Sequence, residues 1–317
     1  MTMKMIESKK GVKVRFIIHQ ILYAIKYQNI SFDKIFEIKK KKENLKIADF
    51  SLINDVVLSS MRLFLYVNQI INIYIKKKPN KHQYILLLSS ITQLVYLNYP
   101  NYAVINCAVE IAKNKKISAV PIFINGILKK IDSDKSKLAK INLKNKVFKK
   151  LPNKKIFDEI NNRNKKSIFE SVAQKPHTHL VFKQKININE LSFNIIKSTD
   201  ISGIINNNKS LTSIKEFNSG MFWVQDFSAM LPLYLTKIPK NFEALDMCSA
   251  PGGKTFQLIQ KGAKVHAVEK SKGRVIKLKK NLNRLNYDSI IKIDDVLKLN
   301  EDKKYNFIIV DAPCSSI

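Results

Sequence analysis

A glycine-rich loop from Cys248 to Lys254 contains the strongest candidate ligand-binding residues of the sequence. It reads Cys-Ser-Ala-Pro-Gly-Gly-Lys and lies between an apolar run and a helical pattern. Gly252 and Gly253 let the backbone turn sharply and approach a ligand closely. The free amide groups at the start of the following helix favour electron-rich ligand atoms, including a carboxylate. We therefore expect this loop to hold a ligand.

Three kinds of nucleotide ligand compete for such a loop. A phosphate-binding loop needs Gly-x-x-x-x-Gly-Lys-Ser/Thr, and Cys248 stands where its first glycine belongs, although Gly253, Lys254 and Thr255 match. The Gly-x-Gly-x-x-Gly pattern of a dinucleotide site is absent. S-adenosyl-L-methionine needs a close-approach loop for its amino-acid part and an acidic residue after the second strand for its ribose hydroxyls. Glu269 ends that predicted strand and fits this role.

Acidic residues also follow the next two predicted strands. Asp295 can serve the adenine amino group, with neighbouring Asp294 as the alternative, and Asp311 closes the fourth strand beside the expected methyl donor. Carboxylates in these places also suit a positively charged sulfonium. A plain glycine-rich turn followed by ordinary strand-end acids is the alternative that this pattern alone leaves open.

Alternating strands and helices are expected to position these residues. The predicted strands are 243–249, 263–270, 289–295 and 305–313, and the predicted helices between them are 252–262 and 273–286. This order predicts an open parallel sheet, in which ligands bind at the carboxyl ends of the strands.

The preceding sequence differs in pattern. From about residue 11 to 132 apolar residues recur at helical spacing, which predicts a bundle of five or so helices. One of them is expected over 51–75 with Ser51 as its cap, and Cys107 is expected in the core. The fold class is thus an all-α bundle, a small α/β connector with short strands near 179–186 and 201–208, and an α/β sheet. We expect domains at 1–132, 133–219 and 220–317.

Composition narrows the partners and the compartment. Lys and Arg number 56 against 25 Asp and Glu, and the net charge of +31 favours a polyanion, with nucleic acid as the first candidate. AT-rich codon usage explains many of the lysines but not the scarcity of acids. The three cysteines show neither zinc nor disulfide spacing, and we expect a monomer in a reducing cytoplasm. His177 and His179 are expected in a surface loop, with no metal, and no apolar run is long enough to span a membrane.

Several motifs together resemble one family. "LDMCSAPGGKT" followed by "VDAPCS" resembles the Sun/RsmB family of RNA cytosine methyltransferases, relatives of the nucleolar Nop proteins. "FWVQDFSAMLP" resembles the Val-Gln-Asp-x-Ser-Ala stretch that precedes the first motif in that family. "YPNYAVINCAVEIAKNKKISAVPIFINGILKKI" resembles the last part of the NusB-like RNA-binding bundle that such enzymes carry. The likeness covers most of the chain and is weaker between about 133 and 219.

The resemblance implies a Rossmann-like class I methyltransferase sheet behind a NusB-like bundle. It also implies transfer of a methyl group from S-adenosyl-L-methionine to carbon 5 of a cytosine in small-subunit ribosomal RNA. By motif matching, the cofactor residues are Cys248, Ser249, Ala250, Pro251, Gly252, Gly253, Lys254, Glu269, Asp295 and Asp311. Ser249 replaces the family's alanine and Glu269 replaces its aspartate, and both changes are conservative.

The reaction needs a thiolate that adds to carbon 6 of the base and so activates carbon 5. Cys314 is the cysteine nearest the expected methyl donor, but the resemblance gives it an accessory role in product release. It places the attacking thiol in a later Thr-Cys motif, and no Thr-Cys pair occurs in these 317 residues. We therefore expect a C-terminally truncated enzyme that is inactive as written. The alternatives are a non-catalytic RNA-binding protein and a P-loop ATPase.

Overall fold

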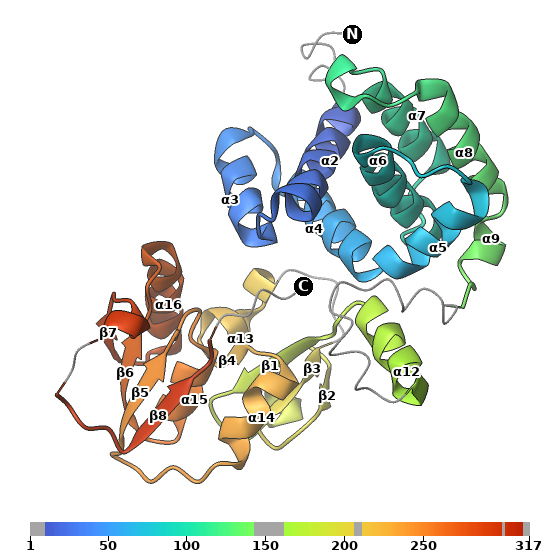
Figure 1. Cartoon of the computed structure of the whole chain (residues 1–317). Coiled ribbons are helices and arrows are strands. Elements are labelled where there is room, and N and C mark those ends of the chain that lie inside the picture. The colour runs from blue at the N-terminus through green and yellow to red at the C-terminus, as the bar shows by residue number, and fades with distance from the viewer. Residues whose placement is uncertain (1–9, 143–161, 206–210, 300–301, 313–317) are drawn as a thin grey trace. The chain divides into compact units, whose positions relative to one another are not determined.

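The computed structural model describes residues 10–142, 162–205, 211–299 and 302–312. It shows two compact units, Met1–Lys175 and Pro176–Ile317 (Figure 1). The first unit is helical, and the second contains two sheets. The predicted fold class, helices followed by an α/β region, is therefore confirmed. The domain boundaries at 132 and 219 remain predictions, because a compact unit need not coincide with a domain.

Helices make up the first unit. They are α2 (Lys10–Gln28), α3 (Phe32–Lys42), α4 (Ile47–Arg62), α5 (Phe64–Tyr74), α6 (Lys81–Ile91), the π-helical turn η1 (Thr92–Tyr96), α7 (Asn101–Ala112), the short η2 (Lys115–Ile117), α8 (Pro121–Ser133), α9 (Lys135–Leu138) and α12 (Asn162–Ala173).

Helix α6 packs against α2, α4, α5, α7 and α8 within this unit (Figure 1). Every residue from Ile85 to Ile91 is buried, which explains why its sequence is a continuous apolar run and not a one-sided stripe. A capping box begins the helix: Asn80 Oδ1 accepts from the Gln83 amide at 2.9 Å, and Gln83 Oε1 accepts from the Asn80 amide at 3.1 Å. Cys107 on α7 is buried in this core, as predicted.

The single helix expected over 51–75 is wrong. The chain bends by 74° between α4 and α5, with Leu63 at the break. Helix α4 begins at Ile47, where the Asp49 carboxylate accepts from the Lys46 amide at 3.2 Å, so Ser51 is not the cap. Among the described residues no single helix meets the length and hydropathy of a membrane span, and the bent pair α4 and α5 meets them only when counted together.

The second unit begins with an antiparallel sheet in the order β2-β3-β1-β4. Its elements are β1 (Thr178–Phe182), η3 (Ile188–Glu190), β2 (Ile195–Lys197), β3 (Ser202–Ile205), η4 (Leu211–Ser213), α13 (Lys215–Asn218) and β4 (Phe222–Val224). The strands expected near 179–186 and 201–208 are present as β1 and β3. The surface-loop assignment is wrong for His179, which is a buried residue of β1, while His177 is exposed.

A parallel sheet in the order β7-β6-β5-β8 follows. Its elements are α14 (Phe227–Leu235), β5 (Glu243–Met247), α15 (Gly253–Gln260), β6 (Lys264–Val268), α16 (Lys272–Leu285), β7 (Ile290–Lys292), η5 (Val296–Lys298) and β8 (Phe307–Val310). All neighbouring strands are parallel, as predicted, so their carboxyl ends meet at one edge. Strand β8 lies at an edge of this sheet, with Ile308 and Val310 exposed.

One apolar cluster joins the two sheets. Val181 of β1 and Trp223 of β4 pack with Phe256 of α15 and Leu278 of α16, and all four are buried. The Trp223 and Phe256 rings meet edge to face with their centroids 5.7 Å apart, a favoured aromatic geometry. The antiparallel sheet is therefore anchored beside the helix that follows the glycine-rich loop.

Candidate cofactor site

The loop from Cys248 to Gly252 connects β5 to α15 at the carboxyl edge of the parallel sheet. Gly252 has φ +119°, a conformation that L-residues rarely adopt, and a Cβ there would lie 2.0 Å from Cζ of Phe256. Glycine is therefore required at 252 both by the backbone and by the packing. Cys248 also has positive φ, at 63°, which is uncommon for a non-glycine residue.

Neighbouring elements hold this loop from two directions. The Ser249 amide donates to the Val268 carbonyl at 3.0 Å, which ties the loop to β6. From α16, Arg274 donates to the Ala250 carbonyl and Asn281 donates to the Pro251 carbonyl at 3.3 Å. Sequence reasoning did not single out Arg274, because its reach back to the loop depends on how α16 packs.

Glu269 follows β6 and is 4% exposed. Its Oε1 accepts from the Ser271 amide at 2.9 Å, and its Oε2 lies 3.3 Å from Nη1 of Arg274. Oε2 is buried and accepts no hydrogen bond from the described residues. Because buried carboxylate oxygens are normally hydrogen-bonded, this atom is suited to receive a donor from a ligand. A pair of ribose hydroxyls supplies such donors, so the residue present fits the predicted role.

A second acidic group lies below the loop. Asp246 of β5 is 1% exposed and accepts from Thr255 Oγ1 at 2.5 Å. Burial raises the pKa of Asp246 to about 6, against the opposing effects of the Thr255 hydrogen bond and the Lys254 charge. The other carboxylate oxygen, Oδ1, is buried without a partner among the described residues. The sequence signal for Asp246 is an acid inside an apolar strand, and the motif analysis did not use it.

Lys254 joins the loop to the neighbouring strand β8. Its Nζ lies 2.5 Å from Oδ2 of Asp311, the acid predicted to stand beside the methyl donor. The Lys254 side chain is 13% exposed and that of Asp311 is 60% exposed, so the pair lies at the solvent boundary of this edge. The structure thus brings together the first-strand loop and the fourth-strand acid.

The acids after β7 lie one strand beyond Glu269. Asp295 begins η5, accepts from the Leu297 amide at 3.2 Å and receives the Lys270 ammonium at 2.8 Å. The Lys270 hydrogen bond, followed by the Leu297 amide, lowers the pKa of Asp295. Asp294 Oδ1 accepts from the Asp295 amide at 2.8 Å, so the two acids point into one turn. Either can serve a ligand at this end of the edge.

The cysteines differ in their surroundings. Burial, and then the negative charge of Glu269, raise the pKa of the Cys248 thiol, which disfavours the nucleophilic thiolate. Cys107 is buried in the helical unit. Cys314 lies outside the described residues. Residues 10–142, 162–205, 211–299 and 302–312 contain no group of three metal-binding side chains.

The P-loop alternative does not fit this geometry. A phosphate loop presents its Thr hydroxyl to a magnesium ion. Here Thr255 is fully buried and donates its hydroxyl to Asp246. The Lys254 ammonium is held by Asp311.

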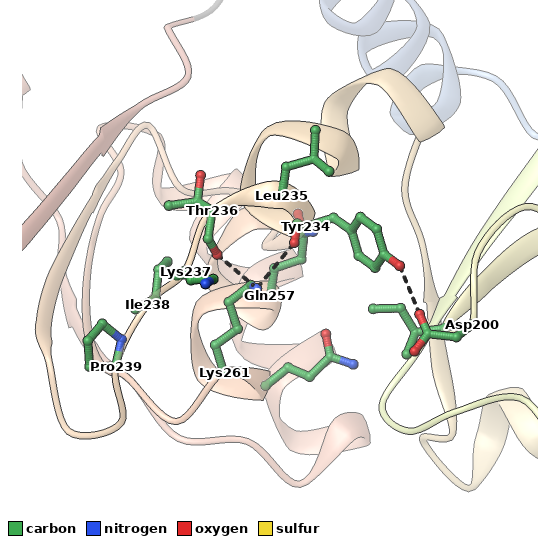
Figure 2. A pocket seen from close by; sticks show the side chains of 11 residues that line it. Asp200, Tyr234, Leu235, Thr236, Lys237, Ile238, Pro239, Gln257 and Lys261 are labelled. Atoms are coloured by element: carbon green, nitrogen blue, oxygen red, sulfur yellow. Dashed lines mark hydrogen bonds between the residues drawn. The ribbon is translucent and has the colours of Figure 1, made fainter.

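A cavity of about 780 Å³ lies elsewhere in the second unit (Figure 2). It is lined by the ends of α14 and α15, the loop that follows α14, and Asp200 and Ile201. In Figure 2 the Tyr234 hydroxyl points to Asp200, at 3.0 Å, and Lys261 reaches the carbonyl of Thr236 at 3.1 Å. None of the predicted cofactor residues lines this cavity. We place the candidate site at the strand ends because the loop lies there, together with two buried carboxylate oxygens that accept no hydrogen bond from the described residues.

Two protein families match parts of this chain. Residues 12–133 match the NusB family, and residues 233–317 match the 16S rRNA methyltransferase RsmB/F family.

Individual relatives agree with these matches. The ribosomal RNA small subunit methyltransferase B of Proteus mirabilis is 25% identical over 97% of this chain and 77% of its own length. A tRNA (cytosine(72)-C(5))-methyltransferase of Pyrococcus horikoshii is 32% identical over 34% of this chain and 29% of its own. The crystal structure of PH0851 matches this chain with a TM-score of 0.61 at 16% sequence identity. The match covers 96% of this chain and 74% of the PH0851 chain, and at this identity it supports the fold alone.

The matches and the geometry agree on the order of the parts. The NusB match falls on the helices of the first unit, and the RsmB/F match contains β5 to β8 with the loop that joins β5 to α15. The chain therefore carries a match to the NusB family followed by a match to the 16S rRNA methyltransferase RsmB/F family, and it is similar along most of its length to a ribosomal RNA small subunit methyltransferase B.

Proposed function

We propose that the second unit binds S-adenosyl-L-methionine at the carboxyl ends of β5 to β8 and that the protein serves methylation of cytosine carbon 5 in small-subunit ribosomal RNA. The observation that carries the cofactor proposal is the buried Glu269 carboxylate, one oxygen of which accepts no hydrogen bond from the described residues, at the same strand edge as the glycine-rich loop. Parallel sheets bind nucleotide ligands at this edge.

Each residue at the edge has a distinct part in this proposal. Glu269 accepts from the ribose hydroxyls, and Asp295 or Asp294 accepts from the adenine amino group. The loop from Cys248 to Lys254 lies against the amino-acid part of the cofactor. The cofactor would supply a methyl group on a positively charged sulfonium, and Asp311, whose carboxylate pairs with Lys254 in this structure, stands at the same strand edge.

The RNA substrate is supported by charge and by the NusB match. The chain carries a net charge of +31, which favours binding to a phosphate backbone. On the helical unit Lys81 lies over the Tyr27 ring at 5.3 Å and Lys26 over the Tyr84 ring at 5.1 Å. Both lysines are exposed and can contact RNA phosphates. We propose ribosomal RNA over tRNA because the relative named for ribosomal RNA aligns over 97% of the chain.

The thiol chemistry is proposed only in part. Cys314 retains the accessory role that its motif implies. Neither Cys107, in the helical core, nor Cys248, whose pKa is raised, is suited to attack the base. We therefore propose that a polypeptide of these 317 residues binds the cofactor without completing the transfer. A monomer in a reducing cytoplasm also remains a proposal, based on composition.

Photolabelling tests the cofactor proposal directly. Irradiation of the folded chain with radiolabelled S-adenosyl-L-methionine, followed by peptide mapping, should place the label within 243–254 or 264–274. Label on the peptides of the Figure 2 cavity instead would move the site to α14 and its loop. A folded chain that takes no label but binds RNA in low salt would favour the alternative, an RNA-binding protein without a cofactor.

A further inference from the structure

We propose that Gln225 is a positioning residue for the cofactor loop, whose side chain fixes where the backbone runs at Gly253. Gln225 belongs to the Val-Gln-Asp-x-Ser-Ala stretch, which the proposed function leaves without a role. Only the affinity test of this inference rests on the proposed function. The contacts between Gln225 and the loop are seen in the chain without a ligand.

A buried chain of hydrogen bonds holds the Gln225 amide at both ends. The Trp223 indole Nε1 donates to Gln225 Oε1 at 2.8 Å, Gln225 Nε2 donates to Gln257 Oε1 at 2.8 Å, and Gln257 Nε2 donates to the Met230 carbonyl at 2.9 Å. An indole N–H can only donate and a carbonyl can only accept. The two ends therefore fix the orientation of both amides, and the Gln225 side chain has one favoured position.

The Gln225 backbone is held as well. Its amide donates to the His179 carbonyl at 3.2 Å, and His179 Nδ1 donates to the Gln225 carbonyl at 2.9 Å. Gln225 is 8% exposed and Gln257 is 1% exposed, so water does not compete freely for these bonds. The antiparallel sheet thus fixes Gln225, and Gln257 of α15 completes the link to the helix that follows the loop.

Gln225 lies directly against Gly253. A Cβ on Gly253 would stand 3.1 Å from Cδ of Gln225 and 3.3 Å from its Cγ and Nε2, tighter than ordinary contact. The φ of Gly253 is not positive, so its backbone would accept any L-residue. Glycine is thus favoured at 253 by the tight contact with Gln225, whereas at 252 the backbone itself requires it. The Gln225 side chain therefore packs against Gly253, the second glycine of the loop.

A double-mutant cycle between these two residues tests the proposal. The affinity for S-adenosylhomocysteine is measured by calorimetry for the full chain, for Gly253→Ala, for Gln225→Ala and for the double variant. Gly253→Ala alone should weaken binding roughly tenfold. In a protein that already carries Gln225→Ala, the same change should weaken binding by less than about twofold, because the side chain that the new Cβ would contact is gone and contacting residues are energetically coupled. If Gln225→Ala folds poorly, Gln225→Met keeps the volume with a flexible thioether that can give way, and should relieve Gly253→Ala in part.

Gln260 offers a matched control. It also ties α15 to the antiparallel sheet, donating to the carbonyls of Phe182 at 2.6 Å and Lys183 at 3.0 Å, but at the other end of the helix. Gln260→Ala should leave the effect of Gly253→Ala unchanged. Equal effects of Gly253→Ala with and without Gln225, or equal relief by Gln260→Ala, would overturn the proposal.

A second measurement separates this inference from the proposed function. The same cycle is run without ligand by urea unfolding, followed through Trp223, the one tryptophan of the chain. Gly253→Ala should lower the unfolding midpoint in the parent and not in the Gln225→Ala background. If the folded parent fails to bind S-adenosylhomocysteine, the proposed function fails, and the unfolding cycle still decides the role of Gln225.

Discussion

Replacing Asp246 with asparagine should stabilise the second unit at neutral pH. The carboxyl group is 1% exposed, and burial, opposed by Thr255 and Lys254, raises its pKa from 3.8 to about 6. The folded chain therefore favours the neutral acid. The stability contributed by that preference is present below pH 3.8 and is lost as the pH rises through about 6. Asparagine keeps an oxygen for the Thr255 hydroxyl and carries no charge, so it avoids this loss.

The pKa shift sets the magnitude. At 1.36 kcal/mol per pKa unit, a rise from 3.8 to about 6 corresponds to about 3 kcal/mol in the free energy of unfolding. The advantage of Asp246→Asn should therefore be about 0.5 kcal/mol at pH 4 and grow to about 3 kcal/mol above pH 7. Because the group is buried, solvent screening reduces this figure little.

Urea unfolding followed by Trp223 fluorescence measures this directly, since Trp223 packs in the same apolar cluster as Phe256 beside the loop. Unfolding free energies of the parent and of Asp246→Asn are compared from pH 4 to pH 8. Asp302→Asn, at an exposed position of the same unit, controls for the loss of a charge. A variant that is less stable than the parent at pH 7.5, or an advantage that does not change with pH, would show that burial does not raise the pKa of Asp246 in the folded chain.

Three further outcomes follow from the site and the charge. Gly252→Ala should abolish the rise in Tm that S-adenosylhomocysteine causes, because both the φ and the Phe256 ring exclude a Cβ; a retained rise would contradict the loop geometry. Glu269→Gln should weaken calorimetric affinity for S-adenosylhomocysteine about tenfold through loss of charged hydrogen bonds, and an unchanged affinity would remove Glu269 from the site. The lysines at 76–78 are exposed in the connection between α5 and α6. Replacing all three with alanine should reduce the slope of log affinity for single-stranded RNA against log salt by about 2, and an unchanged slope would place the RNA elsewhere.

The local sequence pattern was sufficient to predict the parallel sheet. Apolar runs with helical segments between them predicted β5 to β8, and parallel order then placed Glu269 and Asp311 at the edge that holds the glycine-rich loop. The break at Leu63 was not predictable in the same way, because no glycine or proline marks it. Strands β2 and β4 have three residues each, too few to show a period of two.

The residues missed at the site act through contacts distant in sequence. Arg274 reaches the loop across 24 positions, and Gln225 meets Gln257 across 32. The burial of Asp246 and His179 depends on which neighbours cover the strand, and a sequence read alone does not give that. Motif matching gave the residues that we propose to face a ligand, while the residues that hold the loop emerged only from packing.

Calorimetric titration of the folded 317-residue chain with S-adenosylhomocysteine tests whether the strand ends of the second unit bind the cofactor. With folding verified by the buried emission of Trp223, we expect saturable binding at one site, which Gly252→Ala removes. A folded chain that gives no binding heat at several temperatures, or one that binds equally well with alanine at 252, would contradict this expectation.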